Sequence, residues 1–190
     1  MKKQKLLLVL GAVSCVALTS CGKTEITASE AKEIARSASE FETSDYKSFK
    51  VSTKITKYDV SGGSAAIYKD VLAKLLNDCK SFEIGKASTE TYDYSVLTIP
   101  SYIITKESID EVSKDSTVKF YKEGNKLSAT ITVNVEQSLG SVGSFKMTTT
   151  STNNYDDKGY FVNGNANIDA TLVDNSTCSL AIETSVEWVK

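Results

Sequence analysis

The sequence contains no histidine and a single arginine, Arg36. Without histidine, the chain lacks the side chain whose ordinary pKa best suits acid–base catalysis near neutral pH, and it lacks the commonest metal ligand. One guanidinium is too few for the bidentate clamps that hold phosphate groups. These absences argue against most enzyme, metal-binding and nucleotide-binding classes, so we expect no enzymatic activity, no metal site and no cofactor.

Proline is also scarce, occurring only at Pro100, and no Ser-, Gly- or Pro-rich tract is present to form an extended stalk. The 190 residues are 41% apolar and 24% charged, with a formal net charge of −2. This composition is that of a globular protein and excludes a disordered polyelectrolyte or a membrane-spanning bundle. A mildly acidic chain is a poor ligand for nucleic acid, so we expect no nucleic-acid partner.

The N-terminus reads as an export signal. Lys2, Lys3 and Lys5 precede an apolar stretch over residues 6–18. That stretch has the length of the hydrophobic part of a secretion signal and is too short to cross a bilayer as a helix. We therefore expect residues 1–20 to be a signal peptide that is removed.

The signal ends in Leu18-Thr19-Ser20-Cys21, which resembles the lipobox of bacterial lipoproteins. The resemblance implies cleavage before Cys21 and a diacylglycerol group on its sulfur, carrying palmitate or similar chains that anchor the protein stably in a bilayer. It places the protein at the extracytoplasmic face of the cell membrane, with residues 21–26 as a lipidated tether. The alternative is a secreted protein with a free cysteine near its new terminus.

Two amphipathic helices are expected. Thr27 and Glu30 form a capping-box pattern ahead of apolar residues spaced by three and four, which predicts a helix over 28–40. A second helix is predicted over 65–79, with Leu72, Leu75 and Cys79 on its apolar stripe. A weaker helical turn is predicted around 108–114.

From residue 49 onward the pattern is mainly period two, which is typical of strands with one buried face. The clearest case is 127–136, where Ile131 and Val133 alternate with Thr130 and Thr132. Strands are expected over about 49–56, 81–86, 91–99, 101–104, 118–121, 127–136, 145–149, 160–162, 166–172 and 178–188, with turns over 122–126, 140–143 and 153–159. The Asx residues of the last turn faintly resemble a calcium loop, but Lys158 and Asn165 stand where calcium ligands are required, and an ordinary turn explains the pattern more simply.

The sequence therefore predicts a single α+β domain over 27–190. The expected architecture is a curved antiparallel β-sheet, an open half-barrel, with two amphipathic helices covering its apolar face. This order of elements behind a lipobox resembles the LolA/LppX-like lipoprotein carriers, which implies an apolar cavity for acyl chains. The residues expected to line such a cavity share the inward strand and helix positions: Val51, Ile55, Leu72, Leu75, Ile131, Val133, Phe145 and Met147.

Cys79 and Cys178 are the thiols that remain after removal of the signal and lipidation of Cys21. An exported protein can form a disulfide between them, and two small buried hydrophobic residues are the alternative.

Two functions are compatible with these features. The first is a membrane-anchored lipoprotein that binds a lipid or another amphiphile in an apolar cavity under the sheet. The second is a non-catalytic interaction module that binds an envelope protein, a host protein or a glycan through a Thr-, Ser- and Tyr-rich sheet face. An unfilled apolar interior would favour the first function, and a solidly packed one would favour the second.

Overall fold

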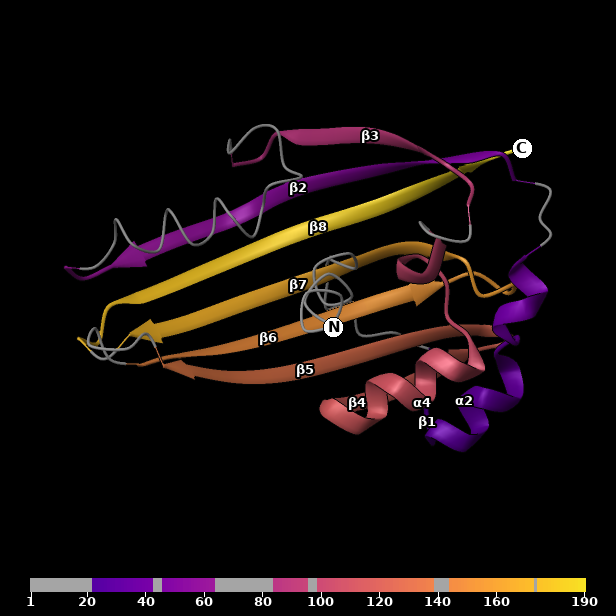
Figure 1. Ribbon diagram of the computed structural model, residues 1–190, viewed down its shortest axis with the longest axis horizontal. Helices are drawn as coiled ribbons and strands as arrows, with labels where there is room; N and C mark the ends of the chain where they lie inside the picture. The colour runs from indigo at the N-terminus through magenta and orange to yellow at the C-terminus, as the bar shows by residue number, and fades with distance from the viewer. Residues whose placement is uncertain (1–21, 43–45, 64–83, 96–98, 139–143, 173) are drawn as a thin grey trace.

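The computed structural model of the chain describes residues 22–42, 46–63, 84–95, 99–138, 144–172 and 174–190 (Figure 1). Within these residues eight antiparallel strands form one sheet, in the order β1-β4-β5-β6-β7-β8-β2-β3. The predicted α+β class and antiparallel sheet are confirmed. The strands are β1 Thr24–Ile26, β2 Ser48–Ser61, β3 Ala87–Asp93, β4 Thr117–Glu123, β5 Lys126–Ser138, β6 Ser144–Tyr155, β7 Phe161–Leu172 and β8 Thr177–Val189, and the helical segments are α2 Ala28–Ile34, η1 Ala38–Phe41, η2 Ile99–Ser101 and α4 Lys106–Asp115.

The long central strands follow the period-two alternation of the sequence. On β8, Cys178, Leu180 and Ile182 are buried, whereas Ser179 and Glu183 point to the opposite side. Neighbouring β2 pairs along the full length of β8, with one register shift between Ile55 and Lys57. This bulge places Tyr58 and Val60 on the same side of the sheet as Ile55.

Some predicted strand boundaries are wrong. Residues 84–86 form a turn ahead of β3, residues 81–83 lie outside the described part, and the expected strand over 91–99 is present only where β3 ends. The expected strand over 101–104 is instead η2 followed by an isolated bridge between Ile103 and Tyr160. Ile103 and Ile104 are buried by side-chain clusters at the end of the sheet, so their apolar character requires no strand. In addition, β6 continues to Tyr155, three residues into the expected turn.

The helix predicted over 28–40 is confirmed in its first half only. It begins at the predicted capping box: Glu30 N donates to Thr27 Oγ1 (3.2 Å), and Thr27 N donates to Glu30 Oε2 (2.8 Å). The α-helix ends at Ile34, because Arg36 pairs with Thr105 and the chain then starts the separate turn η1. A pairing between distant residues thus ends a helix that the local periodicity would continue.

The turn predicted near 108–114 is a full helix, α4, of ten residues. Its start is capped reciprocally: Ser108 N donates to Thr105 Oγ1 (3.1 Å), and Thr105 N donates to Ser108 Oγ (2.9 Å). Lys32 of α2 joins the two helices through an ion pair with Asp110 (2.8 Å).

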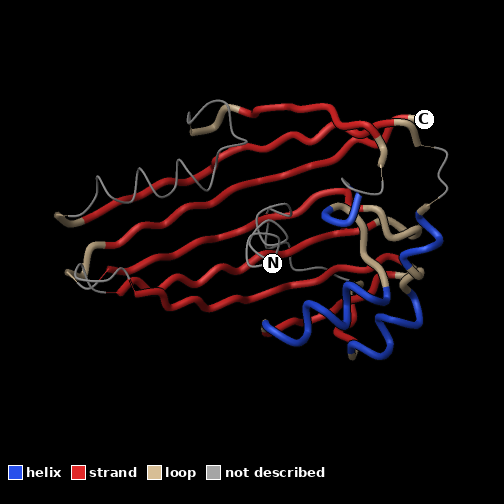
Figure 2. Tube along the Cα trace, in the orientation of Figure 1, coloured by secondary structure: helices blue, strands red, loops and turns tan. Residues whose placement is uncertain are grey.

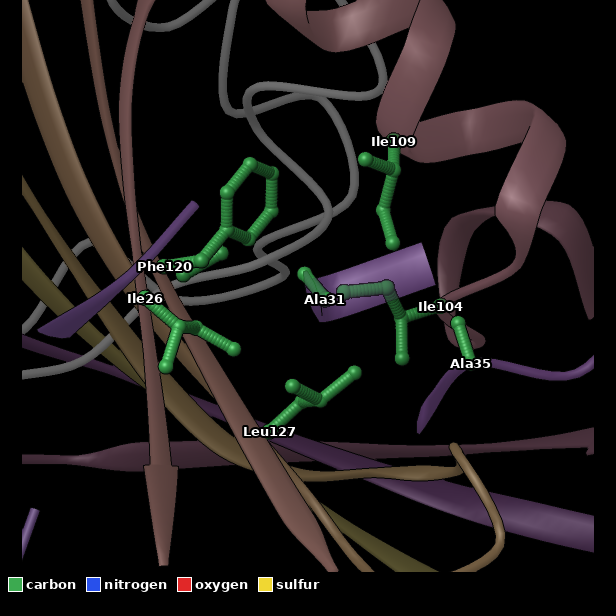
Figure 3. Packing of buried hydrophobic residues seen from close by; sticks show 8 residues of the cluster. Ile26, Ala31, Ala35, Ile104, Ile109, Phe120 and Leu127 are labelled. Carbon is green, nitrogen blue, oxygen red and sulfur yellow. The ribbon is translucent and has the colours of Figure 1, made fainter. Parts of the chain in front are cut away.

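The two described α-helices lie together at one corner of the sheet, beside β1 and β4 (Figure 1, Figure 2). The second helix predicted from sequence, over 65–79, lies outside the described residues. A complete helical cover and the half-barrel curvature therefore remain predictions. The corner itself is a compact apolar cluster built from α2, α4 and three strands (Figure 3), with Ile26, Ala31, Ala35, Ile104, Ile109, Phe120, Leu127 and Ala129 as its buried members.

The predicted tether of residues 21–26 is too long. Thr24–Ile26 is an edge strand of the sheet, with Thr24 opposite Lys122 and Ile26 opposite Phe120. Just ahead of it, Lys23 Nζ donates to Ser128 Oγ (3.0 Å) and to Asn154 Oδ1 (2.9 Å). The folded domain thus begins at Lys23, next to Gly22 and the predicted lipidation site.

Candidate functional site

One side of the sheet carries most of the apolar side chains, and we call it the inner face. The pairing register aligns Ile55, Ile182, Ala166, Ser151 and Ile131 in one row across β2, β8, β7, β6 and β5. The helices α2 and α4 pack on the same side, against the β4 and β5 end of the sheet. The inner face is therefore the side of the sheet on which the sequence predicts the cavity-lining residues.

The residues predicted to line a cavity share this face but not one pocket. Val51 is buried in a cluster with Phe49, and Ile55 is buried in a second cluster that Met147 contacts. Ile131 packs against the helical corner. Val133 lies on the inner face and is half-buried. The register places Phe145 on this face too, but its side chain is outside the described part, as are Leu72 and Leu75 entirely.

A strip of half-buried apolar side chains crosses the inner face between these clusters. Within β5–β7, Val135 is paired with Met147, and Met147 is paired with Ala170. Val133 and Val135 belong to none of the four buried clusters that the described residues form. The strip is partly accessible apolar surface beside a packed interior, and we call it the inner strip: Ile131, Val133, Val135, Met147 and Ala170.

Polar side chains of β6 continue the line of the inner strip. Thr149, Ser151 and Asn153 point to the inner face and are at most 3% exposed. Thr149 is paired with Val133 on one side and with Ile168 on the other. The inner side of β6 therefore changes from apolar at Met147 to hydrogen-bonding at Thr149 and beyond. The sequence does not predict this column, since its only signal is a run of Thr, Ser and Asn that does not alternate with apolar residues.

The end of the inner face at the start of β2 is filled by aromatic rings. Phe49 is fully buried, with ring centroids 5.4 Å from Tyr92, 5.1 Å from Tyr102 and 4.9 Å from Trp188. Trp188 Nε1 donates to the Phe161 carbonyl (2.8 Å). These rings pack as a core, so Val51 beneath them is a core residue.

Of the two cysteines predicted to form a disulfide or to be buried separately, the structure describes only Cys178. Cys178 is a free thiol, buried at the edge of the apolar cluster around Ile55. Burial, and secondarily the nearby Asp169 carboxylate, raise the pKa of the Cys178 thiol. Cys79 lies outside the described residues, so a bridge between the two stays a prediction.

The opposite side, the outer face, is a hydrogen-bonded polar surface. Thr130 Oγ1 lies 3.1 Å from Thr152 Oγ1, Thr148 Oγ1 donates to Asn134 Oδ1 (2.8 Å), and Asn154 Nδ2 donates to Asn163 (2.8 Å). Tyrosine contributes little to the described part of this face. The tyrosines that pack against inner-face clusters are Tyr46, Tyr58, Tyr92, Tyr94, Tyr102, Tyr155 and Tyr160.

On the outer face, Asn165 has a buried side-chain donor that is not hydrogen-bonded in the described structure. Asn165 is paired with Thr152 and Glu183, is 2% exposed, and its Nδ2 has no hydrogen-bond partner in the described structure. A buried amide donor without an acceptor is unfavourable. Because the protein itself covers this amide, the unpaired donor is a local cost in stability and not a contact point for another molecule.

The turn with a faint calcium-loop pattern is an ordinary Asx turn. Asp156 Oδ1 accepts hydrogen bonds from Lys158 N (2.9 Å) and Tyr160 N (2.8 Å), and Gly159 has a φ of 87°. A search of the described residues finds no group of three His, Cys, Asp or Glu side chains placed to hold a metal ion. None of the described helices has the length and apolar character needed to cross a membrane.

Comparison of the chain with protein-family models, with curated proteins and with solved structures found no match.

Proposed function

We propose that the protein is a membrane-anchored bacterial lipoprotein that binds the apolar part of a lipid or another amphiphile on the inner face of its sheet. The lipobox pattern at Cys21 supports the anchor, through which the extracytoplasmic surface of the cell membrane is the first partner. The protein acts by binding and release, without a catalytic step or a cofactor. The half-barrel curvature and the likeness to LolA/LppX-like carriers belong to this proposal.

The observation that carries the proposal is the inner strip. Apolar surface in water is unfavourable in proportion to its area, and contiguous patches on exported proteins commonly mark binding sites. Val133, Val135 and Met147 are adjacent on paired strands and only half-buried. An acyl chain laid along them would remove this surface from water.

The polar column of β6 marks one end of the inner strip. Thr149 is paired with Val133, and Ser151 follows two residues further along the same side of the strand. Both side chains are at most 3% exposed, so they belong to the packed interior and offer no free surface to a ligand. The accessible apolar surface therefore lies on the side of this boundary that holds Val133, Val135 and Met147.

The polar outer face favours a second candidate, the interaction module, in which a polar partner docks on the exposed side chains of Asn134, Thr148 and Asn163. A backbone carbonyl or a sugar hydroxyl of the partner would form hydrogen bonds with these amide and hydroxyl groups. This candidate predicts that Asn163→Ala weakens partner binding and that substitutions in the inner strip do not.

Native mass spectrometry of residues 22–190, which include every described residue, tests the first proposal. The protein is secreted from a bacterium through a non-lipoprotein signal and purified without detergent. A co-purified mass in the range of a fatty acid or phospholipid, lost after extraction with organic solvent, supports it. A ligand-free mass that stays unchanged after incubation with membrane lipid extract contradicts it and favours the interaction module.

A further inference from the structure

The point at which the chain leaves the sheet toward Cys21 is fixed by Lys23. Its ammonium is bonded to Ser128 on β5 and to Asn154 on β6, and β1 begins at the next residue. Gly22 lies beside the turn that joins β4 to β5, where a Cβ added to it would be 3.8 Å from Glu123 Oε1. The exit point is therefore at the Gly124 turn, on one end of the strands.

The length of chain between this point and the lipid is short. Consecutive Cα atoms are about 3.8 Å apart, so the Cα of Cys21 lies at most roughly 8 Å from that of Lys23. A diacylglycerol group on Cys21 has its glycerol at headgroup depth. The distance between the β4–β5 turn and the bilayer surface is then no greater than the thickness of the headgroup layer.

Lysines gather at the β4–β5 turn, although this end of the sheet as a whole is of mixed charge. Lys23, Lys122 and Lys126 surround the turn, with Glu123 beside it, and Lys122 also faces Glu30 on α2. The β6–β7 turn at the same end carries Asp156 and Asp157 beside Lys158. On the outer face the lysines are paired with carboxylates: Lys50 with Glu187 (3.0 Å), Lys54 with Glu183 (3.9 Å) and Lys146 with Glu136 (3.7 Å).

The helices on the inner side are acidic. Five of their exposed side chains are carboxylates, against two exposed lysines, Lys106 and Lys114, and a half-buried Lys32. An anionic bilayer repels such a surface and attracts lysines at short range. The exposed carboxylates are Glu30, Glu33, Glu107, Asp110 and Glu111.

From the short tether and the lysines around the β4–β5 turn, we infer that the domain stands on its membrane by the end of the sheet that carries this turn, with its strands pointing away from the bilayer. The inference rests on the proposed lipidation of Cys21. The opposite end of the sheet, where β8 begins at Thr177, is one strand length away. For the 13 residues of β5 that length is roughly 40 Å.

Energy transfer to the bilayer tests this orientation. The full chain is expressed and processed in a bacterium and reconstituted into phosphatidylglycerol–phosphatidylcholine vesicles that contain an acceptor-labelled lipid. A donor is attached at Asn125→Cys or at Thr177→Cys, both exposed positions, in a Cys79→Ser, Cys178→Ala background. We expect transfer from residue 125 to be about threefold larger or more, because the two sites differ by a strand length in height.

A longer tether provides the matched control. Insertion of about ten Gly and Ser residues after Gly22 makes the tether a flexible coil and should reduce the difference between the two donors. Hydrogen exchange of the lipidated protein without engineered cysteines gives a second readout that requires no labelled variant. Vesicle binding should slow exchange at residues 122–126 and leave 174–177 unchanged.

The outcomes separate the orientation from the proposed function. The mass of the N-terminal peptide reports whether Cys21 carries a diacylglyceryl group, and its absence would overturn both. Suppose instead that the protein is lipidated, that energy transfer from the two donors is equal, and that vesicle binding slows hydrogen exchange equally at residues 122–126 and 174–177. This result would overturn the orientation but would not affect the proposed lipoprotein assignment.

Discussion

Val135 and Met147 face each other across the β5–β6 ladder, and Met147 is paired in turn with Ala170 on β7. All three side chains are half-buried on the inner face of the sheet. Because the pairing is continuous, these residues form one apolar surface that crosses three strands. The proposed ligand-binding role depends on this surface.

An exchange of isosteric residues on β5 tests the surface directly. Val133→Thr places a hydroxyl in the inner strip, whereas Thr132→Val makes the reverse change on the outer face of the same strand. Burying an unpaired hydroxyl against an acyl chain costs about 1–3 kcal/mol, so Val133→Thr should weaken binding of a fluorescent fatty acid by roughly tenfold or more. Fluorescence titration of both variants is the measurement, and equal affinities would contradict the role of the inner strip.

Lys23 should stabilise the start of the domain. Lys23→Met removes the hydrogen bonds to Ser128 and Asn154, and we expect a loss of about 1–2 kcal/mol in the free energy of unfolding. Urea denaturation of the mature chain gives the value. Lys126→Met, at an exposed position close by, is the control and should change stability by less than about 0.5 kcal/mol. Equal effects of the two substitutions would show that the hydrogen bonds of Lys23 to Ser128 and Asn154 do not stabilise the domain.

Gly164 should tolerate no side chain. A Cβ at this position would lie 2.7 Å from Cε2 of Phe161 and 2.9 Å from Oδ1 of Asn153, whereas one at Gly63 would have nothing within 4 Å. Overpacking of this kind costs about 2 kcal/mol, so Gly164→Ala should lower Tm by roughly 6 °C. Calorimetry of Gly164→Ala and Gly63→Ala checks this, and a Tm change of the same size in both would refute the packing argument.

Alkaline pH should destabilise the fold through Tyr155. Burial raises the pKa of Tyr155 to about 12, and a hydrogen bond with Asn153 opposes the rise. A group whose pKa is higher in the folded state contributes stability that is complete below its unfolded pKa and is lost as the pH rises through the folded one. The free energy of unfolding should therefore fall between about pH 10 and 12.

The Tyr155→Phe variant isolates this contribution. Its free energy of unfolding should fall less steeply over the same pH range, as measured by urea titration at a series of pH values. An identical slope in the variant and the parent chain would assign the alkaline loss to other groups.

The sequence predicted the parts of the fold that obey a local pattern. The alternation at Ile131 and Val133 on β5, and at Leu180 and Ile182 on β8, placed the correct residues on the buried side. Both strands have a neighbour on each side in the sheet, with apolar side chains on the inner face and polar side chains on the outer face. A strand with two faces of different polarity shows a period of two in its sequence.

The errors occur where distant residues decide the local structure. The α2 helix stops at Ile34 because Arg36 pairs with Thr105, about 70 residues further along the chain. The short edge strand β1 exists because β4 supplies its partner, and three residues carry too little pattern to predict it.

The candidate site was predicted in part. Ile131, Val133 and Met147 do share a surface, but Val51 belongs to the aromatic cluster around Phe49. That cluster forms because β2 lies between β8 and β3, an order that the sequence alone does not specify. The hydroxyl column of β6 was not predicted, because its side chains are polar although they are buried within a strand.

The most direct measurement for the proposed function is photocrosslinking of a diazirine-labelled fatty acid to the mature protein, followed by mapping of the modified peptides. We predict that the label attaches to β5 around Val133 and Val135 and to β6 around Met147, and that excess unlabelled fatty acid competes for these sites. Crosslinks confined to the outer face, or spread over the surface without competition, would contradict binding on the inner strip.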